Sequence, residues 1–269
     1  MIEILDDDMR MAVDPAAPIE QIATGFRFTE GPAWNRRGYL LFSDIPMNRI
    51  HKWEDGQTSV YRDQTKSANG LTFDHQGRLL YCERGRVVRI EKDGAMTVLA
   101  QNGPVMPNDL VYSITGDIYF SDFRIPGQGK SVVYQITRGG QLRVASEEGE
   151  GPNGVALSPN QQKLYVGDAR TAQVRQYDIA PDGGLRNGRV LCPVPGGVDG
   201  LKTDEAGRVW ATGGEKIHVF SSAGKLLGTI AIPERPSNCG WGDGFGTLFI
   251  TARSSVYRLR TKTQGTRTY

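Results

Sequence analysis

The chain has 269 residues, and its 32 Lys or Arg residues nearly balance 30 Asp or Glu residues, giving a formal net charge of +2. This balance, with no block of five like charges, argues against nucleic acid or an anionic membrane as a partner. A hydrophobic share of 38% is enough to fill a globular core. The sequence has no apolar run near the roughly 18 residues that a membrane-spanning helix requires.

The N-terminal stretch and the cysteines indicate a cytoplasmic protein. Residues 6–8 are acidic where a secretory signal would have basic and then apolar residues. Cys82, Cys192 and Cys239 are far apart and lack metal-binding spacing, which predicts buried free thiols in a reducing compartment. We expect residues 1–17 to be an N-terminal extension, and we find no convincing amphipathic helix anywhere in the chain.

One motif recurs six times along the chain, as a tight turn followed by a short alternating apolar run. The turn position falls at Gly38, Gly77, Gly116, Gln162, Gly207 and Gly246, with steps of 39, 39, 46, 45 and 39 residues. Each copy contains a strand, a turn and a second strand, then a third alternating segment, and most continue through another turn into a fourth. This period predicts an all-β, six-bladed β-propeller with four antiparallel strands in each blade.

The two ends of the repeat region predict how the ring closes. Residues 19–28 have no blade of their own, and the last copy ends near Arg260 without a fourth strand. We therefore expect the N-terminal strand to complete the last blade. The predicted domain boundaries are 1–17 for the extension, 18–260 for the propeller and 261–269 for a polar C-terminal tail, which we expect to be frayed.

A second shared position lies just before each inner strand and always holds a carboxylate or an amide. We call these the ring residues: Glu30, Asn69, Asn108, Asn153, Asp199 and Asn238. Inner strands line the channel of a propeller, so these side chains meet around its axis. Asn and Asp are common in turns, but Glu is a poor turn former. Two carboxylates in a channel need a compensating charge, and a hard divalent cation suits carboxylate and amide oxygens.

The three histidines, His51, His75 and His218, lie away from the ring position. This placement argues against a histidine triad or a transition-metal site. No serine lies in a G-x-S-x-G setting that would make it a nucleophile.

The stretches FTEGPAW, ANGLTFD, PNDLVY, GPNGVALSP, VDGLKTDEAGRVWAT and TLFITARSSVYRLR resemble the SMP-30/gluconolactonase family of six-bladed propellers, from about Phe26 to Arg260. The resemblance implies metal ligands at Glu30, Asn153 and Asp199, and a substrate-contacting asparagine at Asn108. Sugar-lactone members commonly have a basic residue before the PND motif, where this chain has Pro-Val-Met-Pro.

These observations predict a metal-dependent hydrolase that opens a lactone, with Asp199 as general base, as in the family, and Glu30 as the alternative base. One divalent cation is expected, with Ca²⁺ first and Zn²⁺, Mg²⁺, Mn²⁺ or Fe²⁺ as alternatives. Asn108, Asn69 and Asn238 are predicted to contact the substrate. Arg124 follows an inner hairpin and either reaches over the channel mouth or is an ordinary surface arginine.

Two other functions fit the same ring. One is hydrolysis of another ester, such as a phosphotriester, and the other is a propeller that binds a metal and a small molecule without turnover. In each case the expected partner is a small molecule, a lactone or ester for the two enzymes. We expect no nucleic acid or membrane partner, and a monomer or weak homo-oligomer.

Overall fold

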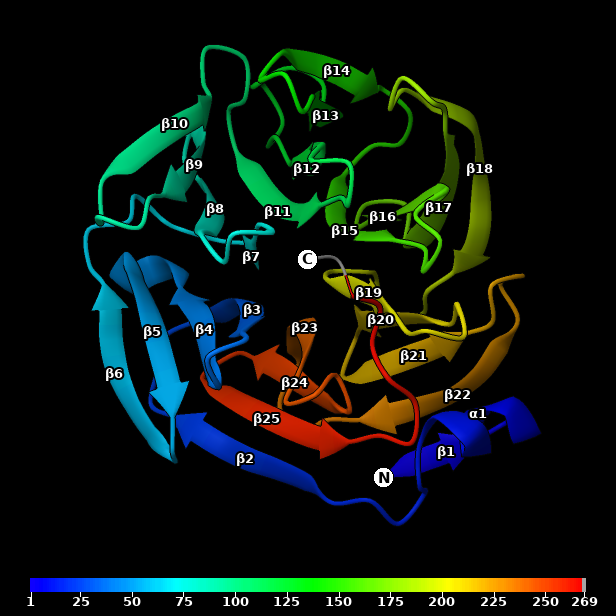
Figure 1. The fold of residues 1–269 in the computed structure, drawn as a ribbon. Helices are drawn as coiled ribbons and strands as arrows, with labels where there is room; N and C mark the ends of the chain where they lie inside the picture. The colour runs from blue at the N-terminus through cyan, green and yellow to red at the C-terminus, as the bar shows by residue number, and fades with distance from the viewer. Residues whose placement is uncertain (268–269) are drawn as a thin grey trace.

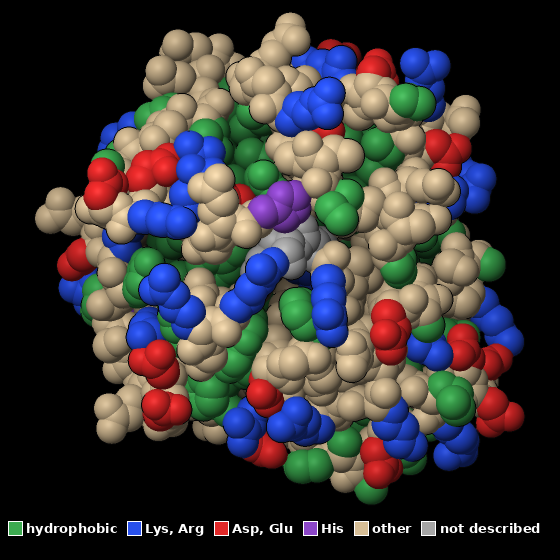
Figure 2. Space-filling view, viewed as in Figure 1, with side chains coloured by type: hydrophobic (Ala, Val, Ile, Leu, Met, Phe, Trp, Pro, Cys, Tyr) green, Lys and Arg blue, Asp and Glu red, His purple; other side chains and the backbone are tan. Residues whose placement is uncertain are grey.

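The structure is a computed structural model, and it describes residues 1–267. Within these residues, six antiparallel sheets surround a central axis like the blades of a propeller (Figure 1). The predicted all-β, six-bladed architecture is confirmed. Seen from the same side, acidic and basic side chains are interspersed over the face of the molecule (Figure 2).

Each blade has four strands ordered from the axis outward, and the fifth blade has one more strand at its outer edge. Blades one to three are β3 (Thr29–Asn35), β4 (Tyr39–Asp44), β5 (Arg49–Glu54), β6 (Gln57–Arg62); β7 (Leu71–Phe73), β8 (Leu79–Glu83), β9 (Arg86–Ile90), β10 (Met96–Ala100); β11 (Pro107–Tyr112), β12 (Ile118–Asp122), β13 (Val132–Ile136), β14 (Leu142–Ser146).

Blades four to six are β15 (Pro152–Leu157), β16 (Lys163–Asp168), β17 (Gln173–Ile179), β18 (Leu185–Pro193); β19 (Leu201–Thr203), β20 (Val209–Gly213), β21 (Lys216–Phe220), β22 (Leu226–Ala231); β23 (Pro236–Gly242), β24 (Thr247–Ala252), β25 (Ser255–Arg260), β2 (Ile19–Thr24). A short 3₁₀ turn at Ile45–Met47 joins β4 to β5.

The ring closes in the sixth blade, as predicted. β2 pairs antiparallel with β25, with Ile19 opposite Leu259 and Thr24 opposite Ser255. In Figure 1 the blue N-terminal strand lies beside the red C-terminal one. Strands from both ends of the chain therefore share one sheet, which holds the ring shut.

The N-terminal extension contains structure that the sequence analysis missed. β1 (Ile2–Ile4) pairs with β22 and adds a fifth strand to the fifth blade. α1 (Asp7–Ala12) follows, capped by the Asp6 side chain, and buries Met9 and Ala12. The expectation of no helix was wrong, because six residues with two buried positions are too few to give a helical period. Among residues 1–267, no helix is long and apolar enough to cross a membrane.

The C-terminal tail packs against the propeller over the part that the structure describes, so the expectation of fraying was wrong for residues 261–267. The Lys262 backbone N–H donates to Ala12, and that of Thr266 donates to Thr203 at 3.0 Å. Gly265 bridges to Asp204. These contacts carry the tail toward the axis (Figure 1). Residues 268–269, the end of the predicted tail, lie outside the described residues.

Neighbouring blades pack through strands that are buried on both faces. On β4, Leu40 and Phe42 pack with Phe249 of the sixth blade, while Leu41 packs with Phe73 of the second. This alternation follows from the two-residue period of a strand. The three cysteines are buried and unpaired, as expected.

Candidate functional site

The ring residues lie at or just before the start of the inner strands, where pairing with the second strand of the same blade becomes irregular. The ladder between first and second strands shifts register at the ring position of four blades, between Glu30 and Ala33, Pro107 and Leu110, Pro152 and Val155, and Pro236 and Asn238. Backbone N–H groups of residues that directly follow a ring residue bond to the next blade. Gly154 donates to the Asp199 carbonyl at 3.0 Å and Gly200 to the Ser237 carbonyl at 2.7 Å. The blades are thereby linked around the axis.

In four blades the residue after the ring residue is glycine, and there the backbone lies very close to the inner segment of the next blade. A Cβ on Gly154 would lie 2.5 Å from the Asp199 carbonyl oxygen, and one on Gly200 would lie 2.0 Å from Asn238 Oδ1. No other residue fits such an approach without a backbone shift. In the third blade the equivalent position is Asp109, whose buried carboxylate lies near the axis beside Asn238.

Glu30 is a buried carboxylate held in place by its neighbours. Its Oε2 accepts hydrogen bonds from Asn238 Nδ2 at 2.9 Å and from the Gly31 backbone. Burial raises the pKa of Glu30 well above its ordinary value, and the negative charges of Asp199 and Asp109 add to this. The environment therefore disfavours the ionised form unless a positive charge is supplied.

Asp199 is the second carboxylate of the ring and is partly exposed to a cavity. Burial raises the pKa of Asp199 to about 7, while a hydrogen bond with the Asn153 side chain and the charge of Arg235 lower it. Glu30 and Asp199 are close enough for their charges to repel. Asn153, itself buried, contacts the same carboxylate.

Asn69 and Asn108 line a smaller cavity of about 130 Å³ beside the ring, together with Arg84 and Phe123. The Oδ1 atom of Asn69 is buried and has no hydrogen-bond partner among the described residues. A buried polar atom without a partner is costly, so such an atom often marks a place where an ion, water or ligand binds. The structure brings these two ring residues, which the sequence predicts to contact substrate, to the wall of one cavity.

The donor set fits a hard divalent cation. Glu30 and Asp199 supply two mutually repelling carboxylates, Asn153 supplies an amide, and Asn69 has an unsatisfied amide oxygen. Across residues 1–267 no three His, Cys, Asp or Glu side chains are grouped for metal binding. The candidate ligands are therefore two carboxylates completed by amide oxygens, a set that suits Ca²⁺, Mg²⁺ or Mn²⁺.

A larger cavity of about 630 Å³ lies next to the ring and contains Asp199 in its wall. Its basic lining residues are Arg27, Arg235 and Arg253, and Phe28 and Glu234 also contribute. The sequence analysis did not identify these residues. They occupy three separate segments with no shared repeat position, so no periodic signal marked them.

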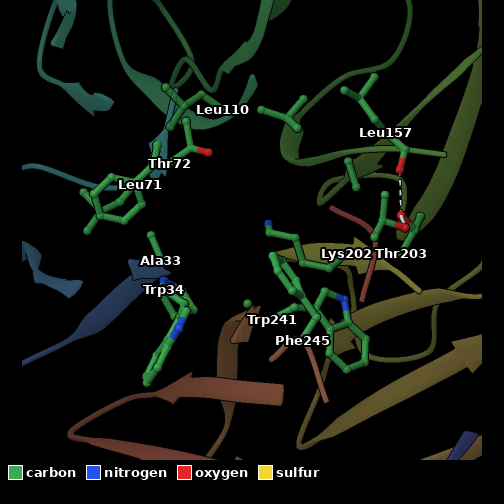
Figure 3. Close-up of a pocket in the computed structure, with 16 residues that line it drawn as sticks. Ala33, Trp34, Leu71, Thr72, Leu110, Leu157, Lys202, Thr203, Trp241 and Phe245 are labelled. Carbon is green, nitrogen blue, oxygen red and sulfur yellow. Dashed lines mark hydrogen bonds between the residues drawn. The ribbon is translucent and has the colours of Figure 1, made fainter. Parts of the chain in front are cut away.

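Farther along the axis, the channel narrows. Lys202 Nζ lies 3.4 Å from Asp109 Oδ2, and Asn238 Nδ2 lies 3.5 Å from the same oxygen. Figure 3 shows the Lys202 side chain pointing inward among residues that include Leu110 and Trp241. The cavity there measures only about 60 Å³. The ring is therefore open on the Asp199 side and nearly filled on the Lys202 side.

Asn238 and Arg124, both predicted to contact substrate, are engaged with the protein. Asn238 is 1% exposed, donates to Glu30 and accepts from the Cys239 backbone. Arg124 Nε pairs with Asp122 at 2.8 Å, and Nη2 donates to Tyr134 Oη at 3.1 Å. In this structure Asn238 orients Glu30. Arg124 stabilises its own loop through these contacts, and it lines neither the cavity beside Asp199 nor the cavity beside Asn69.

Comparisons with known proteins identify the family and the fold of the chain. Residues 28–254 match the model of the SMP-30/Gluconolactonase/LRE-like region. A gluconolactonase from Zymomonas mobilis is 30% identical in sequence, and the alignment covers 94% of this chain and 84% of the relative's length. A pentonolactonase from Haloferax volcanii is 26% identical in sequence, and the alignment covers 86% of this chain and 83% of the relative's length.

Among solved structures, a gluconolactonase from Xanthomonas campestris superposes with a TM-score of 0.89 at 29% identity, covering 97% of this chain and 94% of its own. The matching region contains all six ring residues. The chain therefore belongs to the SMP-30/gluconolactonase/LRE-like family.

Proposed function

We propose that this chain is a metal-dependent lactonase, an enzyme that hydrolyses the ester bond of a cyclic ester. The observation that carries the proposal is the pair of close, desolvated carboxylates, Glu30 and Asp199, beside an open cavity. The gluconolactonase and pentonolactonase relatives support the same reaction class.

Glu30, Asn153 and Asp199 are the proposed ligands of one divalent cation, with Asn69 Oδ1 as a further oxygen donor. The oxygen-only set favours Ca²⁺, and Mg²⁺, Mn²⁺, Zn²⁺ and Fe²⁺ are the alternatives. When bound, such a cation polarises the lactone carbonyl and stabilises the oxyanion that forms on it.

Asp199 is the proposed general base, because its carboxylate borders the cavity in a ring without histidine. It takes a proton from the attacking water as the water oxygen bonds to the carbonyl carbon. The ring C–O bond then breaks, the leaving oxygen takes up the proton, and a hydroxy acid is released. Asn108 is proposed to hold the substrate by hydrogen bonds from its side of the ring. Asn238 keeps Glu30 oriented.

The test combines a substitution with chelation. Asp199→Asn and removal of divalent cations should each abolish opening of D-glucono-1,5-lactone while leaving thermal unfolding cooperative. Asp93→Asn, an exposed turn residue that caps only the Ala95 backbone, is the matched control and should retain activity. A phosphotriester tested alongside separates the lactonase from the alternative hydrolase. Lactone opening that survives both treatments would rule out the proposal.

A further inference from the structure

Three arginines from separate segments meet at the cavity beside Asp199. Arg27 precedes β3, Arg235 precedes β23, and Arg253 lies in the turn between β24 and β25. All three side chains are exposed, as ordinary surface arginines are. They differ from ordinary surface arginines in converging on one concave site of about 630 Å³.

None of these three guanidinium groups has an ion-pair partner within residues 1–267. The acidic residues nearest in the cavity are already engaged. Glu234 accepts from Ser254 through its backbone and hydroxyl, both at 2.9 Å, and from Tyr257 Oη at 3.0 Å. Asp199 is committed to the cation in the function proposed above. The cavity wall therefore carries three arginines against two carboxylates, Asp199 and Glu234, and no arginine is ion-paired to either of them within residues 1–267.

Hydrogen bonds to a buried or half-buried carboxylate hold the backbone at two of these arginines, Arg27 and Arg253. Asp44, which is buried, accepts from the backbone N–H groups of Arg27 and Phe28, each at 3.2 Å. Glu234 fixes the turn that carries Arg253, through the Ser254 bonds described above. Arg253 has a φ of 43°, a left-handed conformation that glycine or asparagine adopts more readily. Hydrogen bonds from Ser254 to Glu234 thus hold the turn in which Arg253 adopts a backbone conformation that favours glycine or asparagine.

Positive charge fixed beside a polar catalytic ring is suited to binding an oxyanion, because guanidinium groups form charge-assisted, often bidentate bonds to phosphate and carboxylate. We propose that Arg27, Arg235 and Arg253 form an anion subsite, and that the substrate is a lactone bearing a phosphate or a carboxylate group away from its ester. This inference rests on the proposed lactonase function. The ester then lies at Asp199 while the anionic group occupies the arginine cavity, whose wall also contains the exposed Phe28 side chain.

The experiment compares three lactones on the metal-loaded enzyme: D-glucono-1,5-lactone, its 6-phosphate and D-glucaro-1,4-lactone. The ratio of kcat/KM for an anionic lactone to that for the neutral one is the readout. We expect a ratio of about ten or more in the wild type, since charge-assisted bonds are stronger than neutral ones. Arg27→Gln, Arg235→Gln and Arg253→Gln should each reduce the ratio several-fold, mainly through KM. The phosphate and the carboxylate lactones distinguish which oxyanion is preferred.

Two further variants separate a built subsite from general charge. Arg260→Gln removes an exposed arginine at the other end of β25 and should leave the ratio unchanged. Arg84→Gln removes positive charge from the Asn69 cavity. If Arg84→Gln lowers the ratio as much as Arg253→Gln does, long-range attraction explains the preference and the subsite is wrong. A wild-type ratio near one also overturns it.

A binding measurement keeps the anion subsite testable if no lactone is opened. Titration calorimetry with inorganic phosphate and with D-gluconate 6-phosphate needs no turnover. Binding that Arg253→Gln weakens about tenfold supports the subsite even where the lactonase proposal has failed. Absence of binding, or equal binding by wild type and all three variants, overturns the subsite. The lactonase proposal is then decided separately, by the hydrolysis of neutral lactones.

Discussion

Replacing Lys202 by Met tests how the protein tolerates three carboxylates near one axis. Lys202 Nζ is the cation closest to Asp109, 3.4 Å from its Oδ2. The other contacts of that oxygen, to the Val155 N–H at 3.4 Å and Asn238 Nδ2 at 3.5 Å, are long and carry no formal charge. In Lys202→Met, the buried Asp109 carboxylate loses this ion-pair partner.

The size of the effect follows from distance and exposure. Two unit charges 3.4 Å apart attract by about 5 kcal/mol at an effective dielectric constant of about 20. The Lys202 side chain is 24% exposed, so solvent screens the pair, and its ammonium loses some hydration on folding. We expect these terms to cancel over half of the attraction. Lys202→Met should then lower the free energy of unfolding by about 2 kcal/mol.

Urea titrations with a chelator present measure this loss without interference from bound cations. The set comprises wild type, Lys202→Met, Asp109→Asn and the double variant. The double variant should be more stable than the sum of the two single losses predicts, by about 1 kcal/mol or more, because it leaves no unpaired charge. Lys216→Met, an exposed lysine of the same blade, should change stability by less than about 0.5 kcal/mol. Additive single losses, or an unchanged Lys202→Met, would refute the reasoning.

Three further predictions concern single side chains. Asn69→Ala removes an oxygen that has no hydrogen-bond partner among the described residues, so we expect a free energy of unfolding within about 0.5 kcal/mol of wild type. We expect calorimetry to show weaker cation binding, and a clear loss of stability would contradict this reasoning. Gly265→Ala places a Cβ 1.9 Å from the Trp241 ring and should cost about 1 to 3 kcal/mol in urea, whereas Gly246→Ala, which meets open space, should cost little. Burial raises the pKa of Cys192 to about 12, so above pH ~8.5 the unfolded thiol ionises first and stability falls with pH by about 1.4 kcal/mol per unit. Cys192→Val should flatten that slope between pH 9 and 11, and an identical slope would show that this thiol does not contribute.

The blades and the ring residues were predictable because they depend on local, repeated signals. Turn glycines such as Gly38 and Gly116 adopt φ values of 97° and 91°, which L-residues rarely do, so their spacing marks each blade. The polar residue eight or nine positions earlier then falls at the same place on every inner strand. Strand period and turn spacing therefore suffice to bring Glu30 and Asp199 to one axis.

The helix, the tail and the arginine cavity depend instead on contacts between distant segments. α1 is held because Met9 and Ala12 pack on the fifth and sixth blades, and the tail because Gly265 fits against Trp241. Arg27, Arg235 and Arg253 are far apart in sequence and share no register. No local pattern distinguishes such residues from solvated ones, so only the folded ring reveals which of them meet.

Asp109 shows that a break in the repeat was itself an available signal. Glycine follows the ring residue in four copies, and the structure explains it by the close approach of neighbouring strands, whereas the third copy has Asp109 and the sixth has Cys239. In the third copy the buried Asp109 carboxylate lies near the axis beside Asn238, where its charge requires a cation nearby. Lys202, on the inner strand of the fifth blade, supplies it. The ring thus has two layers with separate counterions, a lysine for Asp109 and, in the proposed function, a divalent cation for Glu30 and Asp199.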